Sequence, residues 1–315
     1  MHRWDALMDG HLRDCETRGL AASTITTKRN ELIRFGSWLR SRRPKVNLEK
    51  VDSDLIIKFL RTRSIAHAKA TLSSLVTICR CMGEYLVEQN MWLKNPLRWI
   101  KGPKISSTSH LPRTVGPAQM KQIWEVAAAE PKHGSRHKYL AMLALLYGTG
   151  IRRGELSRLK LSDWDKETGV IRIDGQKSNR DRKVCVGEGM WRCIEAYLPY
   201  RHNLLERHGH LNEQSFFISK NGLPLKAEDM SACLKRLCEK AGVKAGMHKF
   251  RHSCASDLLA KGVAISDVQK ILGHSTIGNT MRYAHIIDPE KVKAIAQHPI
   301  NRFLQEVTEP IREAL

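Results

Sequence analysis

The stretch "LGHSTIGNTMRYAH", residues 272–285, places a histidine nine residues before a tyrosine. Nine residues correspond to about 900° of rotation on one continuous α-helix, so His274 and Tyr283 would face opposite sides of it. The glycine of "LGH" indicates that one helix ends there, and Asn279 is predicted to cap a new helix that carries Tyr283. With a break between the two helices, both rings can point toward a common centre.

Two simpler interpretations of this stretch have to be weighed. A single tyrosine after a turn is most often a partly buried packing residue of an amphipathic helix. Alternatively, "AISDVQKILGHSTIGNTMRYAH", residues 264–285, has the helix, glycine turn and second helix of a helix-turn-helix DNA reader. The rest of the chain has to decide between them.

Charge is the strongest global feature of the chain. Its 315 residues include 53 Lys+Arg against 32 Asp+Glu, a formal net charge of +21. Of these, 20 basic and 10 acidic residues lie before residue 106, which leaves 33 and 22 after it. Both parts are therefore basic, as expected of a protein that touches a polyanion such as DNA with two domains.

Composition also sets the expected class of protein. No apolar run approaches 18 residues and the first residues lack a hydrophobic signal core, so we expect a soluble, cytoplasmic, nucleoid-associated protein without membrane contacts. The eight cysteines show no C-x-x-C pair, which predicts reduced thiols rather than a zinc site or disulfides.

The chain is expected to form two domains, 1–105 and 106–315. Apolar residues at helical spacing predict a helical bundle in the first, with Ser23 or Thr24 and then Asp52 or Ser53 as helix caps. "NPLRWIKGPKISSTSHLPRT", residues 95–114, is typical of a linker. In the second domain, helices are predicted at 117–129 and 137–148, followed by a β-hairpin in "VIRIDGQKSNRDRKVCV", residues 170–186. The predicted fold class is mainly α with a small antiparallel β-sheet.

Two helical segments carry arginines that suit a phosphate. In "LLYGTGIRRGEL", residues 145–156, a glycine turn presents Arg152 at a helix start, with Glu155 one turn later to orient it. In "HKFRHSCASDLLAKG", residues 248–262, His248 and Arg251 project together near a helix N-terminus, which favours anions. Each pair taken alone also fits a surface ion pair or a solvated helix end, and no further ligand completes a zinc site with His248 and His252.

The hairpin supplies a possible proton donor, because a lysine on a flexible tip can reach into a neighbouring site. Lys177 and Lys183 are the candidates. Exchange at a phosphodiester needs a nucleophile, cationic donors for the equatorial oxygens, and an acid and a base for the leaving and attacking oxygens. The chain offers a complete set without a metal: Tyr283, Arg152, Arg251, His248, His274 and a hairpin lysine.

"TGIRRGEL", "HKFRH" and "LGHSTIGNTMRY", with the hairpin lysine between the first two, resemble in order and spacing the boxes of the tyrosine recombinase (phage integrase, Xer-type) family. The likeness covers about 111–290 well, whereas the first domain resembles the family's SAM-like core-binding domain in size and helix pattern. The hairpin departs from the family's frequent G-K-G and contains "GQKSN", so both lysines stay open.

The resemblance implies a role for each residue. Tyr283 would attack the scissile phosphate and form a 3′-phosphotyrosyl link, while Arg152 and Arg251 neutralise the transition state and Glu155 braces them. Lys177 would protonate the 5′ oxygen, His248 would exchange a proton with the tyrosine, and His274 would bond a phosphate oxygen. Neither ATP, a metal nor another cofactor is implied.

The resemblance also implies partners. It predicts a homo-tetramer, or an assembly with a related recombinase, on double-stranded DNA with an inverted-repeat core site. A helix-turn-helix regulator and a type IB topoisomerase remain as alternative functions. The tail after residue 287 has an apolar stripe that would pack either on its own domain or on a neighbouring protomer.

Overall fold

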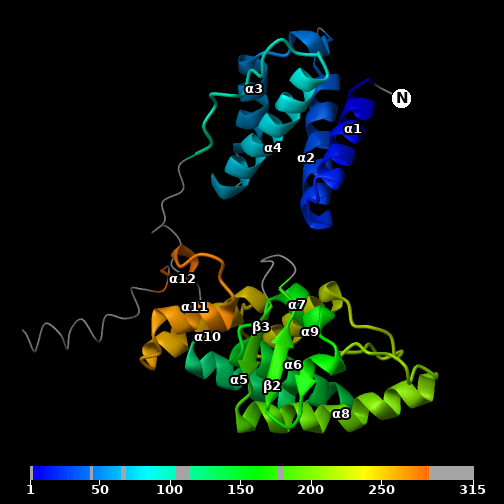
Figure 1. Cartoon of the computed structure of the whole chain (residues 1–315), viewed down its shortest axis with the longest axis vertical. Helices are drawn as coiled ribbons and strands as arrows, with labels where there is room; N and C mark the ends of the chain where they lie inside the picture. The colour runs from blue at the N-terminus through cyan, green and yellow to red at the C-terminus, as the bar shows by residue number, and fades with distance from the viewer. Residues whose placement is uncertain are drawn as a thin grey trace, which may run out of the picture. The chain divides into compact units, whose positions relative to one another are not determined.

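The structure is a computed structural model, which describes residues 3–42, 45–64, 69–103, 114–175, 181–281 and 283. The chain divides into two compact units, Met1–Ser109 and His110–Leu315. Each unit is described by itself (Figure 1). All eight cysteines are free thiols. Within the described ranges, no helix combines the length and the apolar character needed to cross a membrane.

Unit 1 consists of helices in its described part: α1 (Arg3–Thr17), α2 (Ala22–Arg40), the 3-10 turn η1 (Leu48–Lys50), α3 (Ser53–Ser64) and α4 (Lys69–Glu88). Their apolar faces meet in one core, in which the rings of Trp4 and Phe59 both pack on Phe35. Burial of this apolar stripe, rather than helix propensity alone, stabilises such short helices.

The helix caps of unit 1 agree only in part with the sequence. The amide of Leu55 donates to the carboxylate of Asp52 over 2.8 Å, so the predicted cap of α3 is confirmed. The predicted cap at Ser23 or Thr24 is wrong, because α2 begins at Ala22 and its N-cap, Ala21, makes no side-chain bond. Docking of α2 on the core fixes its start without a capping side chain.

Unit 2 begins with α5 (Pro117–Ala128), α6 (His133–Gly148), α7 (Arg153–Arg158) and the turn η2 (Leu161–Asp163). Strands β1 (Trp164–Asp165), β2 (Val170–Ile173) and β3 (Arg182–Cys185) follow and form an antiparallel sheet in the order β1-β2-β3. The remaining helices are α8 (Glu188–His208), α9 (Ala227–Lys240), α10 (Met247–Ala260), α11 (Ile265–Leu272) and α12 (Gly278–Met281). The fold is therefore mainly helical with a small antiparallel sheet, as predicted.

Helix α6 forms the centre of unit 2. Every residue from Ala141 to Leu146 is buried, which requires neighbours around the whole helix. α5, α8 and α10 pack against it, as Figure 1 shows for α5 and α8. In the sheet, Ile173 pairs with Arg182 and Arg172 with Lys183. This register sets which hairpin side chains face the interior.

The end of unit 2 that carries α10 and α11 has its own small core. Cys254, Leu259, Val268 and Leu272 pack there, and Tyr283 joins them. The predicted helix with Asn279 as its cap is wrong, since Asn279 lies inside the four-residue α12 and Tyr283 lies just beyond its end. The tyrosine is therefore carried by a short turn packed on α10 and α11.

Candidate active site

Three arginines converge on the carboxyl end of α11. Arg182 Nε donates to the carbonyl of Ile271 over 2.9 Å, and Arg251 Nη2 donates to Leu272 over 2.7 Å. Arg152 Nη2 donates to the next carbonyl, that of Gly273, over 2.9 Å. The last carbonyls of a helix have no partner within the helix and carry a partial negative charge, so they hold cations there.

Glycines shape the backbone around these arginines. Gly150 has a φ of 59°, and a Cβ at this position would stand 2.4 Å from Leu272 Cδ2. The turn at Gly150 therefore lets α6 end and α7 begin against α11, with Arg152 at the N-cap of α7. The carbonyl of Gly150 accepts a hydrogen bond from Arg251 Nη1, which ties α10 to the same turn.

Glu155 lies between two of the guanidinium groups. Its carboxylate pairs with Arg152 over 2.7 Å and with Arg182 over 2.8 Å, and it accepts the backbone N–H of Arg152 over 2.9 Å. Burial alone would raise the pKa of Glu155, but the bonds and charge of Arg182 and the bonds of Arg152 outweigh it and lower the pKa to about 2. Glu155 is therefore a carboxylate at any pH near neutrality.

The cluster carries an excess of positive charge. Among the ion pairs of the described residues, Glu155 is the one carboxylate paired with this cluster, and it pairs with Arg152 and Arg182 but not with Arg251. Burial, followed by the charges of Arg152 and Arg182, lowers the pKa of Arg251 to about 10. Within the described ranges Nη1 of Arg182 has no hydrogen-bond partner, and Arg182 and His274 both line a cavity of about 390 Å³. An anion entering this cavity would relieve the repulsion.

Tyr283 belongs to the same cluster. Its phenol oxygen and Nδ1 of His252, on α10, form a short hydrogen bond, and the two ring centroids lie 5.7 Å apart. The charge of Tyr283 acts to raise the pKa of Arg251, which places the phenol near that guanidinium. Because Tyr283 is only 2% exposed, its oxygen has to turn outward before it can meet an external phosphate.

The two predicted histidines occupy different environments. His248 is exposed at the start of α10, and its pKa is lowered by partial desolvation and then by the charges of Arg251, Arg153 and Arg152. His274 Nδ1 lies 2.8 Å from the hydroxyl oxygen of Thr280. Burial and then the charges of Arg251, Arg152 and Arg182 lower the pKa of His274 to about 4, so this imidazole is neutral at pH 7.

The two hairpin lysines fare differently. Lys177 lies outside the described residues. Lys183 is exposed on β3, where it alternates with the buried Arg182, so it faces away from the arginine cluster. In this arrangement Lys183 does not point toward the arginine cluster, and the structure does not test Lys177.

Two members of the cluster, Arg182 and His252, were not predicted from the sequence to belong to the site. Arg182 looks like one charge among several in a polar hairpin, although its spacing of two from the buried Val184 could have assigned it to the inner face. His252 lies one turn beyond His248, and the structure gives the bond with the phenol to His252 rather than to His248. Which of the two meets the tyrosine depends on the path of residues 272–283, which spacing along α10 does not specify.

Comparison with known proteins gives the family of this chain. Residues 113–290, more than half of the chain, match the model of the phage integrase family. A relative from Myxococcus xanthus, described as tyrosine recombinase XerC, is 30% identical over 88% of this chain and 90% of its own length. The chain belongs to the phage integrase family of tyrosine recombinases.

Two solved structures share the fold. The XerH site-specific recombinase bound to palindromic difH substrate has a TM-score of 0.71 at 22% identity, over 87% of this chain and 79% of that one. A lambda integrase dimer bound to a COC' core site has a TM-score of 0.67 at 17% identity, over 87% and 95%. At these identities the likeness concerns the arrangement of elements.

Proposed function

We propose that this chain is a site-specific DNA recombinase that cleaves and rejoins strands through a 3′-phosphotyrosyl intermediate and a Holliday junction. One observation carries the proposal: a tyrosine, hydrogen-bonded to a histidine, lies in a cluster of three guanidinium groups with a single paired carboxylate. Its relative named tyrosine recombinase XerC supports the same activity.

The residues suggest how the cleavage step proceeds. The Tyr283 oxygen attacks the scissile phosphorus while Arg152 and Arg251 donate to the equatorial oxygens. As the new O–P bond forms, the bond from phosphorus to the 5′ oxygen breaks, and a hairpin lysine supplies the proton that this oxygen needs. Attack by the 5′-hydroxyl of a second duplex runs the step backward. The phosphotyrosyl bond is thereby exchanged for a new phosphodiester bond, so no ATP is consumed.

The two histidines take separate roles in this scheme. The phenol proton passes to His252 Nδ1, to which it is already hydrogen-bonded. His274, neutral at pH 7, donates to a phosphate oxygen through Nε2, the ring nitrogen that does not contact Thr280. His248 is exposed beside Arg251, where it can exchange a proton with the leaving or incoming oxygen.

Two substitutions separate the histidines. His252→Gln is expected to slow cleavage by about 10²-fold and His248→Gln by less, when protein binding to DNA is saturated. If His248→Gln abolished cleavage while His252→Gln left the rate unchanged, the phenol proton would have to be assigned to His248.

The lysine is identified by the leaving group. A substrate with sulfur in place of the scissile 5′ oxygen needs no proton on departure, because a thiolate leaves unaided. Lys177→Ala is expected to be inactive on ordinary DNA and active on this substrate. Rescue of Lys183→Ala instead would reassign the proton donor.

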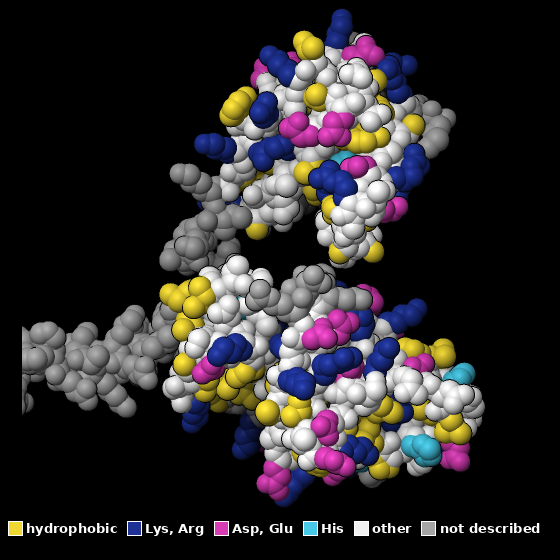
Figure 2. Space-filling view, in the orientation of Figure 1, with side chains coloured by type: hydrophobic (Ala, Val, Ile, Leu, Met, Phe, Trp, Pro, Cys, Tyr) yellow, Lys and Arg dark blue, Asp and Glu magenta, His cyan; other side chains and the backbone are white. Residues whose placement is uncertain are grey.

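The DNA partner and the assembly follow from the same family. We propose a homo-tetramer on two duplexes with inverted-repeat core sites, each protomer using both units on one half-site. Lys and Arg side chains are spread over the visible face of each unit (Figure 2). A relative of similar fold was solved on a palindromic substrate, which is the symmetry that such a site requires.

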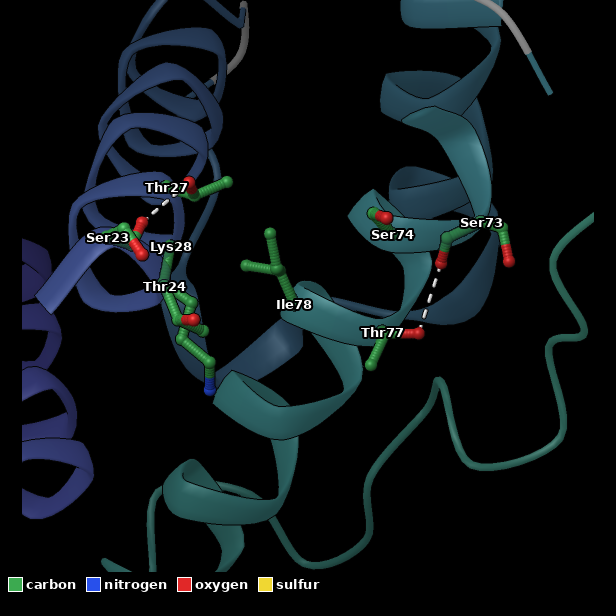
Figure 3. A pocket seen from close by; sticks show the side chains of 8 residues that line it. All are labelled: Ser23, Thr24, Thr27, Lys28, Ser73, Ser74, Thr77 and Ile78. Atoms are coloured by element: carbon green, nitrogen blue, oxygen red, sulfur yellow. Dashed lines mark hydrogen bonds between the residues drawn. The ribbon is translucent and has the colours of Figure 1, made fainter. Parts of the chain in front are cut away.

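In unit 1, a groove between α2 and α4 is suited to the sugar–phosphate backbone. It has a volume of about 450 Å³ and is lined mostly by hydroxyl groups (Figure 3). The hydroxyls of Thr27 and Thr77 donate to the carbonyls of Ser23 and Ser73 in their own helices, so donation to a phosphate is left to the other hydroxyl groups that line the groove. Thr24 and Ser74 line the same groove, so Thr24→Glu is expected to weaken half-site binding by repelling phosphates.

Trapping the covalent intermediate tests the proposed function. On a nicked suicide substrate the wild-type chain should form a covalent adduct and release a 5′-hydroxyl end, whereas Tyr283→Phe should bind the half-site and form none. A regulator would form no adduct with either chain. A topoisomerase would relax supercoiled plasmid without any core site, which plasmids with and without the repeat distinguish.

A further inference from the structure

A second basic cavity lies in unit 2 among α6, α8, α9 and the turn at 219–221. Its volume is about 750 Å³, and it shares no lining residue with the arginine cluster. Four cationic side chains line it in addition to the ion pair of Lys240 with Glu130: Lys132, Lys138, Lys220 and Arg236. Asp229 is the one further carboxylate among the lining residues, so the cavity attracts anions.

Lys138 is the informative residue of this cavity. It is only 9% exposed. Among the described residues, its ammonium group makes one long hydrogen bond, 3.5 Å, to the carbonyl of Ile218. An ammonium group has three donors, and burying it without a counter-charge is costly. Burial accordingly lowers the pKa of Lys138. An anion in this cavity would supply the counter-charge and the acceptors that this buried ammonium group can use.

Close packing and polar side chains shape the wall of the cavity around Lys138. A Cβ on Gly134 would collide with the ring of Tyr200 at 1.6 Å, so only glycine allows this tyrosine to line the cavity. Ser135, Ser219 and Asn221 add neutral hydrogen-bonding groups. Lys220 and Arg236 are exposed at the rim, where they can meet an anion larger than the cavity.

We propose that this cavity is a second phosphate site, which takes a backbone phosphate of the DNA half-site away from the scissile one. The inference rests on the proposed function for its ligand, because a duplex carries phosphates at regular spacing along the length that a two-unit protein covers. Lys138 donates from the floor, and Lys220 and Arg236 donate from the rim. The site positions the duplex and takes no part in the chemistry.

Half-site binding by the full-length chain at several salt concentrations tests the site. Lys138→Met removes the charge but keeps a long side chain, and it is expected to weaken binding about tenfold and to lower the salt slope by about 0.9 for the lost phosphate contact. Lys220→Met, on an exposed residue that cannot unfold the protein, should act in the same direction. The matched control is Lys235→Met, which removes the same charge from an exposed position on α9 outside the cavity.

The outcomes separate the possible sources of the anion. Equal losses for Lys138→Met and Lys235→Met, or no loss for Lys138→Met and Lys220→Met, would overturn the proposal. A third result would also overturn it: inorganic phosphate stabilises the wild type against heat at matched ionic strength, and Lys138→Met abolishes this stabilisation without changing DNA affinity. The site would then hold a small anion rather than DNA. The covalent adduct on the suicide substrate is scored separately, so failure of the proposed chemistry and failure of this site are distinguishable.

Discussion

Two histidines, one in each unit, both have a pKa lowered to about 4, chiefly by burial, but the charges beside them differ. In unit 1, burial and then the charge of Lys28 lower the pKa of His11, whose Nε2 lies 3.4 Å from Lys28 Nζ. In unit 2, burial and then three guanidinium groups lower the pKa of His274. His11 is 3% exposed inside a helical bundle, whereas His274 lines a cavity.

The difference shows how a structural cation is told from a binding cation. Lys28 also contacts the sulfur of Cys15 at 3.4 Å, and although it lines the groove between α2 and α4 it is the one cation that contacts His11 within the described residues. Two of the three arginines beside His274, Arg152 and Arg182, share one carboxylate, and Arg182 lines a cavity with His274. A lowered histidine pKa alone does not mark a functional site; the three guanidinium groups gathered around His274, with one carboxylate among them, do.

The largest expected effect is on the arginine cluster. Arg152→Ala removes a donor aimed at the transition state, and we expect cleavage of a suicide substrate to slow by about 10³-fold, or about 4 kcal/mol. Binding to an uncleavable half-site should fall far less. A cleavage rate within tenfold of the wild type would remove Arg152 from the chemistry.

Glu155→Gln should show the cost of leaving two arginines without their carboxylate. We expect unit 2 to lose about 3 kcal/mol of unfolding free energy at pH 7, measured with urea. Because the folded pKa is about 2 against 4.5 for the free side chain, the stabilisation is present above pH 4.5 and is lost as the pH falls toward 2. The unfolding free energy of the variant should therefore depend less on pH in that window than that of the wild type. An equal pH dependence of the two proteins below pH 4.5 would contradict the ion pairs.

A smaller effect is expected on the pKa values of the two histidines when an anion binds. Orthovanadate, a phosphate analogue, would neutralise the arginine cluster and should raise the pKa of His274 by about one unit while leaving His11 unchanged. Titration of the imidazole proton resonances by NMR, assigned with His11→Gln and His274→Gln, measures both. Equal shifts in the two histidines would show that the anion does not select the cluster.

The smallest effect is expected at an exposed ion pair in unit 1. Arg29 pairs with Asp9 over 2.9 Å, with the arginine side chain 43% exposed. Such pairs contribute little because water screens them, so Arg29→Ala should change the unfolding free energy by no more than about 0.5 kcal/mol. A loss as large as that of Glu155→Gln would erase the contrast between surface and cluster charges.

Much of the site was accessible from sequence because its residues lie at helix ends marked by glycine. Gly150 precedes Arg152 and Gly273 ends α11, and both have positive φ, so the positions of Arg152 and His274 follow from turn chemistry. Arg251 follows from its place on a helix with a buried stripe. The resemblance to the family's motifs then predicted that these residues form one site.

The remaining features depend on long-range packing. Arg182 enters the cluster because β3 pairs with β2 and lies against α11; its alternation with Val184 assigns it to the inner face, but no local signal indicates that this face meets the other arginines. His252 meets Tyr283 because residues 278–281 form a single turn against α11 rather than a longer capped helix. Lys138 forms its cavity with residues up to about a hundred positions away, so no pattern in the sequence reveals it.

Mapping the covalent adduct tests the central claim most directly. After the suicide substrate is trapped and the DNA digested, tandem mass spectrometry should find a nucleotide 3′-phosphate on the phenol oxygen of Tyr283. A nucleotide attached to any other side chain, or an adduct that persists in Tyr283→Phe, would contradict the account.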